Sequence, residues 1–347
     1  MAASGKLRLP EFADVRAAAA RLAGHARRTP LLAGTPLDER TGGRILLKLE
    51  TLQHMGSFKF RGAYNRLAQL DASQRAAGVV AFSSGNHAQG VACAARLLGI
   101  PATIVMPADA PSVKLKNTLA LGAEVIAYDR LRESREEIAA RLAAQRGAVL
   151  VPSFDDPDII AGQGTVGLEI AEQAAELGIG IDDLVVCTSG GGLVAGTALA
   201  VRALSPATRV WTAEPEGHDD HRRSLAAGRR ESNPPGTRSI CDALLAPEPG
   251  VLTFEINRRL LAGGLAVGDP EVRDAIAYAV RTLKLVVEPG GAVALAAVMA
   301  GHIETRGRAV AVVLSGGNID DELLRDVLAS QACSRPAESV AAGELRC

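Results

Sequence analysis

Residues 56–63 read GSFKFRGA, a short glycine-containing segment in which Lys59 is the single lysine. The sequence around it is apolar and helical in pattern, and burying a lone amine is costly unless the amine is paired or used covalently. Burial also lowers the pKa of a lysine, and a neutral amine can attack a carbonyl group to form a Schiff base. The segment therefore predicts a lysine that reacts with a carbonyl compound.

Strand and helix patterns alternate along most of the chain. Apolar runs of strand length stand at 44–49, 78–82, 102–106, 124–128, 148–151, 184–187, 209–213 and 309–314. Helical patterns stand at 87–98, 113–121, 134–144, 193–204, 270–283 and 292–300. This order predicts an α/β fold with mainly parallel sheets flanked by helices on both faces.

The chain of 347 residues is long enough for two domains. Three consecutive strand–helix units predict a small α/β domain at 77–152, and a large domain formed by 1–76 and 153–330. We expect 331–347 to be a flexible tail. A ligand is expected in the crevice between the domains, at the carboxyl ends of the strands.

Composition narrows the class of partner. The formal net charge is −1 and aromatic residues make up 3% of the chain, which argues against binding to nucleic acid. No apolar stretch of the length needed to cross a bilayer is free of charges. The five cysteines are widely spaced without a CxxC motif, which is typical of reduced thiols, so we expect a soluble cytoplasmic protein without membrane or nucleic-acid partners.

Residues 189–193, SGGGL, follow the predicted strand 184–187 and open a helix at Leu193. Backbone N–H groups of successive glycines converge on an anion, and the helix N-terminus adds a favourable dipole. The loop therefore predicts a phosphate site.

A dinucleotide site is the main alternative for this loop. Gly190, Gly192 and Gly196 approximate a dinucleotide-binding fingerprint, and Glu214 follows about 20 residues later, where a ribose-binding acid is expected. The last glycine spacing is one residue too long, and an NAD-dependent oxidoreductase leaves Lys59 without a role. A second match, GQGTVG at 162–167, stands too far from its preceding strand and is predicted to be a loop that enters a helix.

Two further turns follow predicted strands. SSGNH at 83–87 offers hydroxyl, amide and backbone N–H groups to a carboxylate, although the same residues suit an ordinary helix cap. SGGN at 315–318 follows the strand 309–314 and could meet a heteroaromatic ring. The reactive lysine, the phosphate loop and these turns together point to pyridoxal phosphate (PLP).

An acidic loop, EPEGHDD at 214–220, follows the predicted strand 209–213. Oxygen-rich loops of this kind suit Mg²⁺ or Ca²⁺, and the alternative is a solvated acidic turn at a helix N-terminus. Arg135 stands among several charged residues and could reach a carboxylate.

These segments, in this order, resemble the fold type II PLP enzymes, whose fold is tryptophan synthase β-like. The resemblance lies in the serine/threonine dehydratase and serine racemase branch, rests on 57–63 combined with 83–87, and runs from about 28 to about 320. It implies that Lys59 carries PLP and later takes the Cα proton. The other implied cofactor contacts are Phe58 beside the ring, Asn86 at the ring hydroxyl, Gly190, Gly191, Gly192 and Leu193 at the phosphate, and Ser315 at the ring nitrogen.

The resemblance also implies a substrate region and a cation site. Ser84 corresponds to the second acid/base on the opposite face of the cofactor, and Ser83, His87 and Arg135 complete the substrate region. Glu214, the backbone carbonyl of His218 and Asp220 match a divalent-cation site, for Mg²⁺ or for Ca²⁺ or Mn²⁺. One departure is Ser189, where many relatives have a glycine, and we expect changed detail without loss of phosphate binding.

The expected function is a PLP-dependent hydroxy-amino-acid dehydratase, an ammonia-lyase that converts L-threonine and L-serine to a 2-oxo acid and ammonia. Serine racemase and 3-hydroxyaspartate (hydroxyectoine-related) dehydratase are alternatives within the branch. Ser84 permits the first, and Arg135, the histidines and the cation site permit the second. A non-catalytic PLP-binding protein is a further alternative.

Relatives in the branch are usually dimers or tetramers, so we expect a homodimer or homotetramer. We also expect no regulatory domain of the kind found in biosynthetic threonine deaminases, and therefore an enzyme that is catabolic or regulated otherwise.

Overall fold

The computed structural model describes residues 8–110 and 112–332, and its strands form two sheets. The larger sheet has the order β1 (Leu31–Leu32), β2 (Arg44–Leu49), β10 (Ala309–Leu314), β7 (Asp183–Cys187), β8 (Arg209–Pro215), β9 (Gly263–Val267). The smaller has the order β5 (Glu124–Tyr128), β4 (Ala102–Pro107), β3 (Val79–Phe82), β6 (Val149–Leu150). All neighbouring pairs are parallel except β1 with β2. The α/β class with mainly parallel sheets is confirmed.

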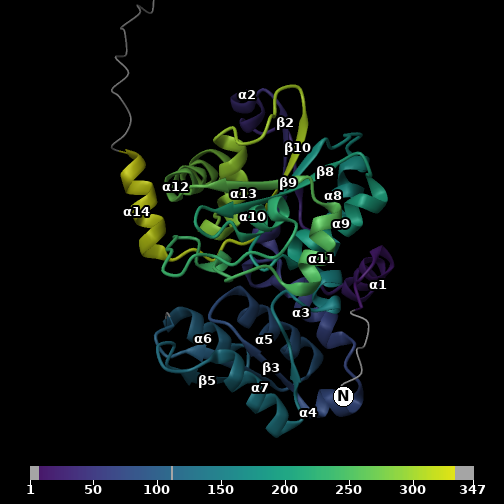
Figure 1. Ribbon diagram of the computed structural model, residues 1–347, viewed down its shortest axis with the longest axis vertical. Helices are drawn as coiled ribbons and strands as arrows, with labels where there is room; N and C mark the ends of the chain where they lie inside the picture. Colours follow the sequence, from purple (N-terminus) through teal and green to yellow (C-terminus); the bar gives the residue numbers. More distant parts are fainter. Residues whose placement is uncertain (1–7, 111, 333–347) are drawn as a thin grey trace, which may run out of the picture.

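Helices separate the strands and pack on the sheets (Figure 1). They are α1 (Phe12–Leu22), α2 (Leu37–Thr41), α3 (Lys59–Ala68), α4 (Ala72–Ala77), α5 (Asn86–Leu98), α6 (Ser112–Ala120), α7 (Arg135–Arg146), α8 (Pro157–Glu176), α9 (Gly192–Leu204), α10 (Asp220–Ala227), α11 (Val251–Leu260), α12 (Asp269–Tyr278), α13 (Pro289–Met299) and α14 (Asp321–Ala332). Among the described helices, none is long and apolar enough to cross a membrane.

The two sheets lie toward opposite ends of the long axis of the molecule (Figure 1). Every strand of the smaller sheet falls between residues 79 and 150, and α3 lies at the junction, where it packs on both α5 and α8. The core around α5 accordingly includes Phe60 and Leu67 of α3. The predicted domain boundaries stay a prediction, and 333–347 of the predicted tail lie outside the described residues.

The predicted strands 44–49, 124–128 and 309–314 are confirmed as β2, β5 and β10 with the same bounds. The sequence analysis did not predict the strands β1 and β9. The expectation of a loop at 162–167 is wrong, because these residues lie within α8. Their glycines serve close helix packing: a Cβ on Gly164 or Gly167 would lie 2.7 Å or 2.6 Å from a backbone oxygen of α9.

The approach of α8 and α9 predicts a loss of stability for Gly196→Ala. A Cβ at this position would lie 2.2 Å from the carbonyl oxygen of Ile160, so the helices must separate. Overpacking of this kind costs about 1–3 kcal/mol. Chemical denaturation should show this loss, whereas Gly180→Ala, where nothing lies within 4 Å of the added Cβ, serves as the control. Equal stability of the two variants would contradict the packing argument.

Candidate active site

A cavity of about 230 Å³ opens at the carboxyl ends of β3, β7 and β10. All the residues that the sequence analysis assigned to the cofactor and the substrate line it: Phe58, Lys59, Ser83, Ser84, Asn86, His87, Arg135, Gly190, Gly191, Gly192, Leu193 and Ser315. β7 and β10 are parallel neighbours and end at one edge of the larger sheet, and the turn after β3 of the smaller sheet lines the same cavity.

Lys59 is the first residue of α3, and its amine lies in the cavity wall. Its Nζ donates a hydrogen bond to the backbone carbonyl of Ser153 at 2.9 Å, and it lies 5.0 Å from the centre of the Phe58 ring. Burial lowers the pKa of this amine to about 8, against the opposing influence of Cys187 and Glu288. A substantial fraction of the amine is therefore uncharged and nucleophilic near neutral pH.

The lysine segment is tied directly to the Ser315 turn. The backbone N–H of Phe58 donates to the carbonyl of Ser315 at 3.1 Å, and Ser57 forms an isolated antiparallel bridge with Gly316. These backbone bonds hold the start of α3 against the end of β10. The position of the Lys59 amine relative to Ser315 is thus set by main-chain contacts.

The glycine loop has no space for side chains. A Cβ on Gly190 would lie 2.4 Å from the Phe154 ring, and one on Gly192 would lie 2.5 Å from Gln163 Oε1. Gly191 has φ +95°, a conformation that L side chains rarely adopt, and α9 begins at the next residue. Closely packed glycines before a helix N-terminus form a cradle for an anion such as a phosphate group.

Ser189, the departure from the branch, has a structural role. Its hydroxyl accepts a hydrogen bond from the backbone N–H of Ala246 at 3.0 Å. Ala246 belongs to a segment, residues 242–246, that lines the cavity. The extra hydroxyl therefore braces a wall of the site, which a glycine cannot do.

Ser315 is buried directly after β10 and has a thiol as its neighbour. A hydrogen bond with Ser315 opposes the influence of burial, which raises the pKa of the Cys187 thiol to about 11. Both groups are therefore uncharged near neutral pH. A heterocycle nitrogen placed against Ser315 would meet a neutral hydroxyl and a neutral thiol.

Glu288 is a site residue that the sequence analysis missed. Asn86 Nδ2 donates to Glu288 Oε1 at 2.6 Å, and Asn318 Nδ2 donates to Asn86 Oδ1 at 2.8 Å. Both ends of the Asn86 amide are thus held in one orientation. Burial raises the pKa of Glu288 to about 7. Glu288 and Asn86 are 202 positions apart, so no sequence pattern joins them, although the VEPGG segment at 287–291 marks an unusual helix start.

The predicted substrate residues all line the cavity but differ in burial. His87 is buried and its ring nitrogen lies 3.0 Å from the carbonyl of Val151; burial, with the charge of Lys59, lowers its pKa to about 3, so the ring is neutral. Arg135 is exposed, and its guanidinium lies 5.5 Å from the centre of the Phe82 ring. Lys114, which the sequence analysis did not name, also lines the cavity and is paired with Asp242 at 3.1 Å.

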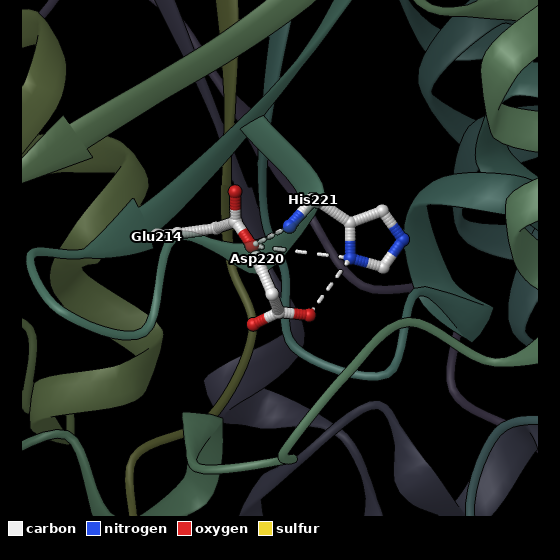
Figure 2. A group of neighbouring side chains, drawn as sticks. All are labelled: Glu214, Asp220 and His221. Atoms are coloured by element: carbon white, nitrogen blue, oxygen red, sulfur yellow. Dashed lines mark hydrogen bonds and ion pairs between the residues drawn. The ribbon is translucent and has the colours of Figure 1, made fainter. Parts of the chain in front are cut away.

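The predicted cation residues lie at the end of β8 and the start of α10, where the structure groups Glu214 and Asp220 with His221 (Figure 2). One ligand atom from each lies within 4.8 Å of the others. Burial raises the pKa of Glu214 well above its usual value, and raises that of Asp220 to about 7. The sequence analysis named the carbonyl of His218 in this site; that assignment stays a prediction, and the His218 ring points elsewhere, 3.3 Å from the Thr237 hydroxyl.

Comparison with known proteins yields a consistent group of matches. The family model described as "Pyridoxal-phosphate dependent enzyme" matches residues 22–316. An L-threo-3-hydroxyaspartate ammonia-lyase from Pseudomonas sp. is 46% identical over 323 residues, which cover 93% of this chain and 99% of that protein. The L-threonine ammonia-lyase of Thermotoga maritima is 42% identical, with coverage of 91% and 77%. The solved structure of maize serine racemase superposes with a TM-score of 0.86 at 39% identity, with coverage of 94% and 98%.

The environment of Lys59 predicts an unusual pH dependence of amine labelling. In PLP-free protein, acylation of Lys59 by a small anhydride should rise with pH and level off above its pKa of about 8, because only the neutral amine reacts. Free N-acetyl-lysine in the same tube should continue to gain reactivity to about pH 10.4. Mass spectrometry of the Lys59 peptide measures the profile. A Lys59 profile that follows the free amine would show that the burial does not lower its pKa.

Proposed function

We propose, from the premise that this chain belongs to the pyridoxal-phosphate dependent enzyme family, that it is an ammonia-lyase acting on a 3-hydroxy amino acid. The reaction removes the β-hydroxyl as water and, after hydrolysis, yields a 2-oxo acid and ammonia. The observation that carries the proposal is that Lys59, the glycine loop and Ser315 line one cavity. The family assignment leaves the NAD-dependent alternative without support.

The residues present fit PLP. The glycine loop at 190–192 would hold the phosphate group, Lys59 would bind the cofactor covalently, and Asn86, fixed by Glu288, would contact the ring hydroxyl. PLP, when bound, stabilises negative charge at the substrate Cα. An orphaned polar atom supports occupancy of the cavity by a polar group: Gln163 Oε1 lines it and has no hydrogen-bond partner in the protein.

The protein's own groups then favour elimination. The Lys59 amine, partly neutral at physiological pH, can accept the proton from Cα. The neutral Ser315 and Cys187 do not hold a proton on the ring nitrogen as a carboxylate would, so departure of the β-hydroxyl competes well with other fates of the substrate. Ser84 remains the proposed second acid/base, and this role also keeps serine racemase as a candidate activity.

L-threo-3-hydroxyaspartate is the substrate that we propose first. The sequence analysis favoured L-threonine and L-serine, but the relative at 46% identity is named for hydroxyaspartate and the one at 42% for threonine. The cavity lining supports this order, because it includes Arg135 and Lys114. An exposed guanidinium in this lining offers charge-assisted hydrogen bonds to a second carboxylate, which threonine and serine lack.

We also propose that Glu214, Asp220 and the carbonyl of His218 hold a divalent cation. Two buried carboxylates with oxygens within 4.8 Å of each other are destabilised when both are ionised without a positive partner, which supports a cation between them. The homodimer or homotetramer, and the cytoplasmic location, stay predictions.

A substrate panel tests the proposed function. PLP-loaded protein should release oxaloacetate and ammonia from L-threo-3-hydroxyaspartate with a higher kcat/KM than it shows for 2-oxobutyrate formation from L-threonine. Chiral analysis of L-serine reactions detects any racemase activity. Absence of 2-oxo acid from every 3-hydroxy amino acid would overturn the ammonia-lyase proposal, and a preference for L-threonine would overturn the substrate order.

Arg135→Ala should discriminate between the substrates. We expect kcat/KM for hydroxyaspartate to fall about tenfold, because one hydrogen bond between charged groups at an exposed position contributes about 1.4 kcal/mol. The value for L-serine should change little. Arg132→Ala is the matched control, since Arg132 is exposed near the start of the same helix and does not line the cavity. Equal losses for both substrates would exclude a role of Arg135 in specificity.

A further inference from the structure

The cluster of Glu214, Asp220 and His221 contains a nitrogen donor that the sequence analysis did not foresee. His221 Nδ1 lies 3.8 Å from Glu214 Oε1 and 3.7 Å from Asp220 Oδ2, and the three side chains point toward one another (Figure 2). Glu214 ends a buried strand, while Asp220 and His221 begin α10. The first turn of this helix thus brings an imidazole to the two carboxylates.

Two of the facing atoms of this cluster, one from Asp220 and one from His221, lack hydrogen-bond partners. All three side chains are buried, with relative exposures of 0%. Asp220 Oδ2 and His221 Nδ1 have no hydrogen-bond partner, although each could accept or donate one. Glu214 accepts hydrogen bonds from the backbone N–H groups of His221 and Arg222, at 2.9 Å and 2.8 Å. Unpartnered polar atoms are rare in protein interiors, so atoms that converge in this way indicate a missing ligand.

Neighbouring arginine side chains do not supply the missing partner of Glu214 and Asp220. The guanidinium groups of Arg222 and Arg223 both bind Asp219, which is the adjacent acid outside the cluster. Asp220 receives a single neutral donor, Asn233 Nδ2, at 2.7 Å through its other oxygen. The buried carboxylates therefore face each other and the ring without a counter-charge among the described side chains that contact them.

The ring of His221 is held by its far nitrogen. Nε2 lies 3.0 Å from the side-chain amide of Asn257, whose Oδ1 has no partner. With that amide turned so that Oδ1 faces the ring, Nε2–H donates to Oδ1, and the Nδ1 lone pair is directed at the carboxylates. Metal-bound histidines usually show this pattern, in which the other ring N–H binds a carbonyl group.

We propose that His221 is a nitrogen ligand, through Nδ1, of a divalent transition-metal ion that Glu214 and Asp220 also bind. This inference rests on the cation site proposed above and changes the class of ion expected there. An all-oxygen site suits Mg²⁺, Ca²⁺ or Mn²⁺, whereas an added imidazole nitrogen shifts the preference toward transition-metal ions such as Fe²⁺ or Zn²⁺. Mn²⁺ can bind both kinds of donor and is paramagnetic, so it is a suitable probe. With Asn257 Oδ1 also unpartnered, a flip of that amide lets it accept the Nε2 proton when the ion binds.

The same histidine connects this ion to the phosphate loop. A Cβ on Gly191 would lie 2.6 Å from His221 Nε2, so the ring packs directly against the loop. Asn257 belongs to α11, and Thr253 of that helix donates to the Gly190 carbonyl at 2.6 Å. An ion that fixes His221 therefore also fixes the loop that holds the cofactor phosphate. By linkage, ion and cofactor should each increase the affinity for the other.

Pulsed electron paramagnetic resonance of the PLP-loaded protein with one equivalent of Mn²⁺ tests the assignment without any substitution. Directly bound imidazole nitrogen should produce a ¹⁴N coupling in the wild-type spectrum. Glu214→Gln should abolish Mn²⁺ binding, which assigns the signal to this site. Mn²⁺ bound through oxygen alone would overturn the nitrogen ligand, and an absence of Mn²⁺ binding would overturn it together with the cation proposal. Both results are independent of the substrate assays.

A variant pair separates the ligand role from the general effect of losing a histidine. His221→Gln should lose the nitrogen coupling, weaken Mn²⁺ binding about 10-fold or more, and remove the ability of Mn²⁺ to slow PLP release. His302→Gln removes an exposed histidine outside the cluster, so it should retain all three properties. Persistence of the coupling in His221→Gln, or its loss in His302→Gln, would contradict the proposal.

Discussion

The buried amine of Lys59 is the constraint on which the rest of the site depends. Its contacts are a backbone carbonyl, at Ser153, and an aromatic ring, and among the described residues no carboxylate forms an ion pair with it. Holding a charged amine in such a place costs free energy, and the lowered pKa expresses that cost. The amine stays in this position because main-chain hydrogen bonds hold the start of α3 against the end of β10. A covalent bond to an aldehyde would give this buried nitrogen a bonded partner.

Around this amine the walls are rigid for identifiable reasons. The glycine loop cannot carry side chains because the Phe154 ring, Gln163 and His221 already occupy that space. Asn86 cannot turn because Glu288 and Asn318 hold the two ends of its amide. On the far side of the loop, His221 and α11 connect it to the acidic cluster. The sites for the cofactor, the substrate and the proposed cation are therefore connected by contacts between neighbouring residues, and the phosphate loop lies between them.

The sequence predicted most of this arrangement, and the exceptions have physical causes. Long apolar runs such as β2 and β10 were identified because buried parallel strands are apolar on both faces. The two-residue β1 and the glycine-containing β9 lie at the edges of the sheet. Neither forms a long run of apolar residues, so the sequence does not mark them as strands. The glycines of α8 led to the prediction of a loop. They are required by the close packing of α8 on α9, and the sequence of one helix alone does not reveal that packing. Glu288 acts through Asn86, 202 positions away, so no local motif marks it. His221 directly follows the predicted acidic loop, but only the first turn of α10 shows that its ring faces Glu214 and Asp220.

The most direct test of the account is the site of covalent attachment of PLP. Borohydride reduction of the PLP-loaded protein, followed by proteolysis and mass spectrometry, should place a single phosphopyridoxyl group on the peptide that contains Lys59. The absorbance band of the bound cofactor should be absent from Lys59→Ala. A phosphopyridoxyl group on any other lysine, or none on the reduced protein, would contradict the assignment of the cavity as the catalytic centre.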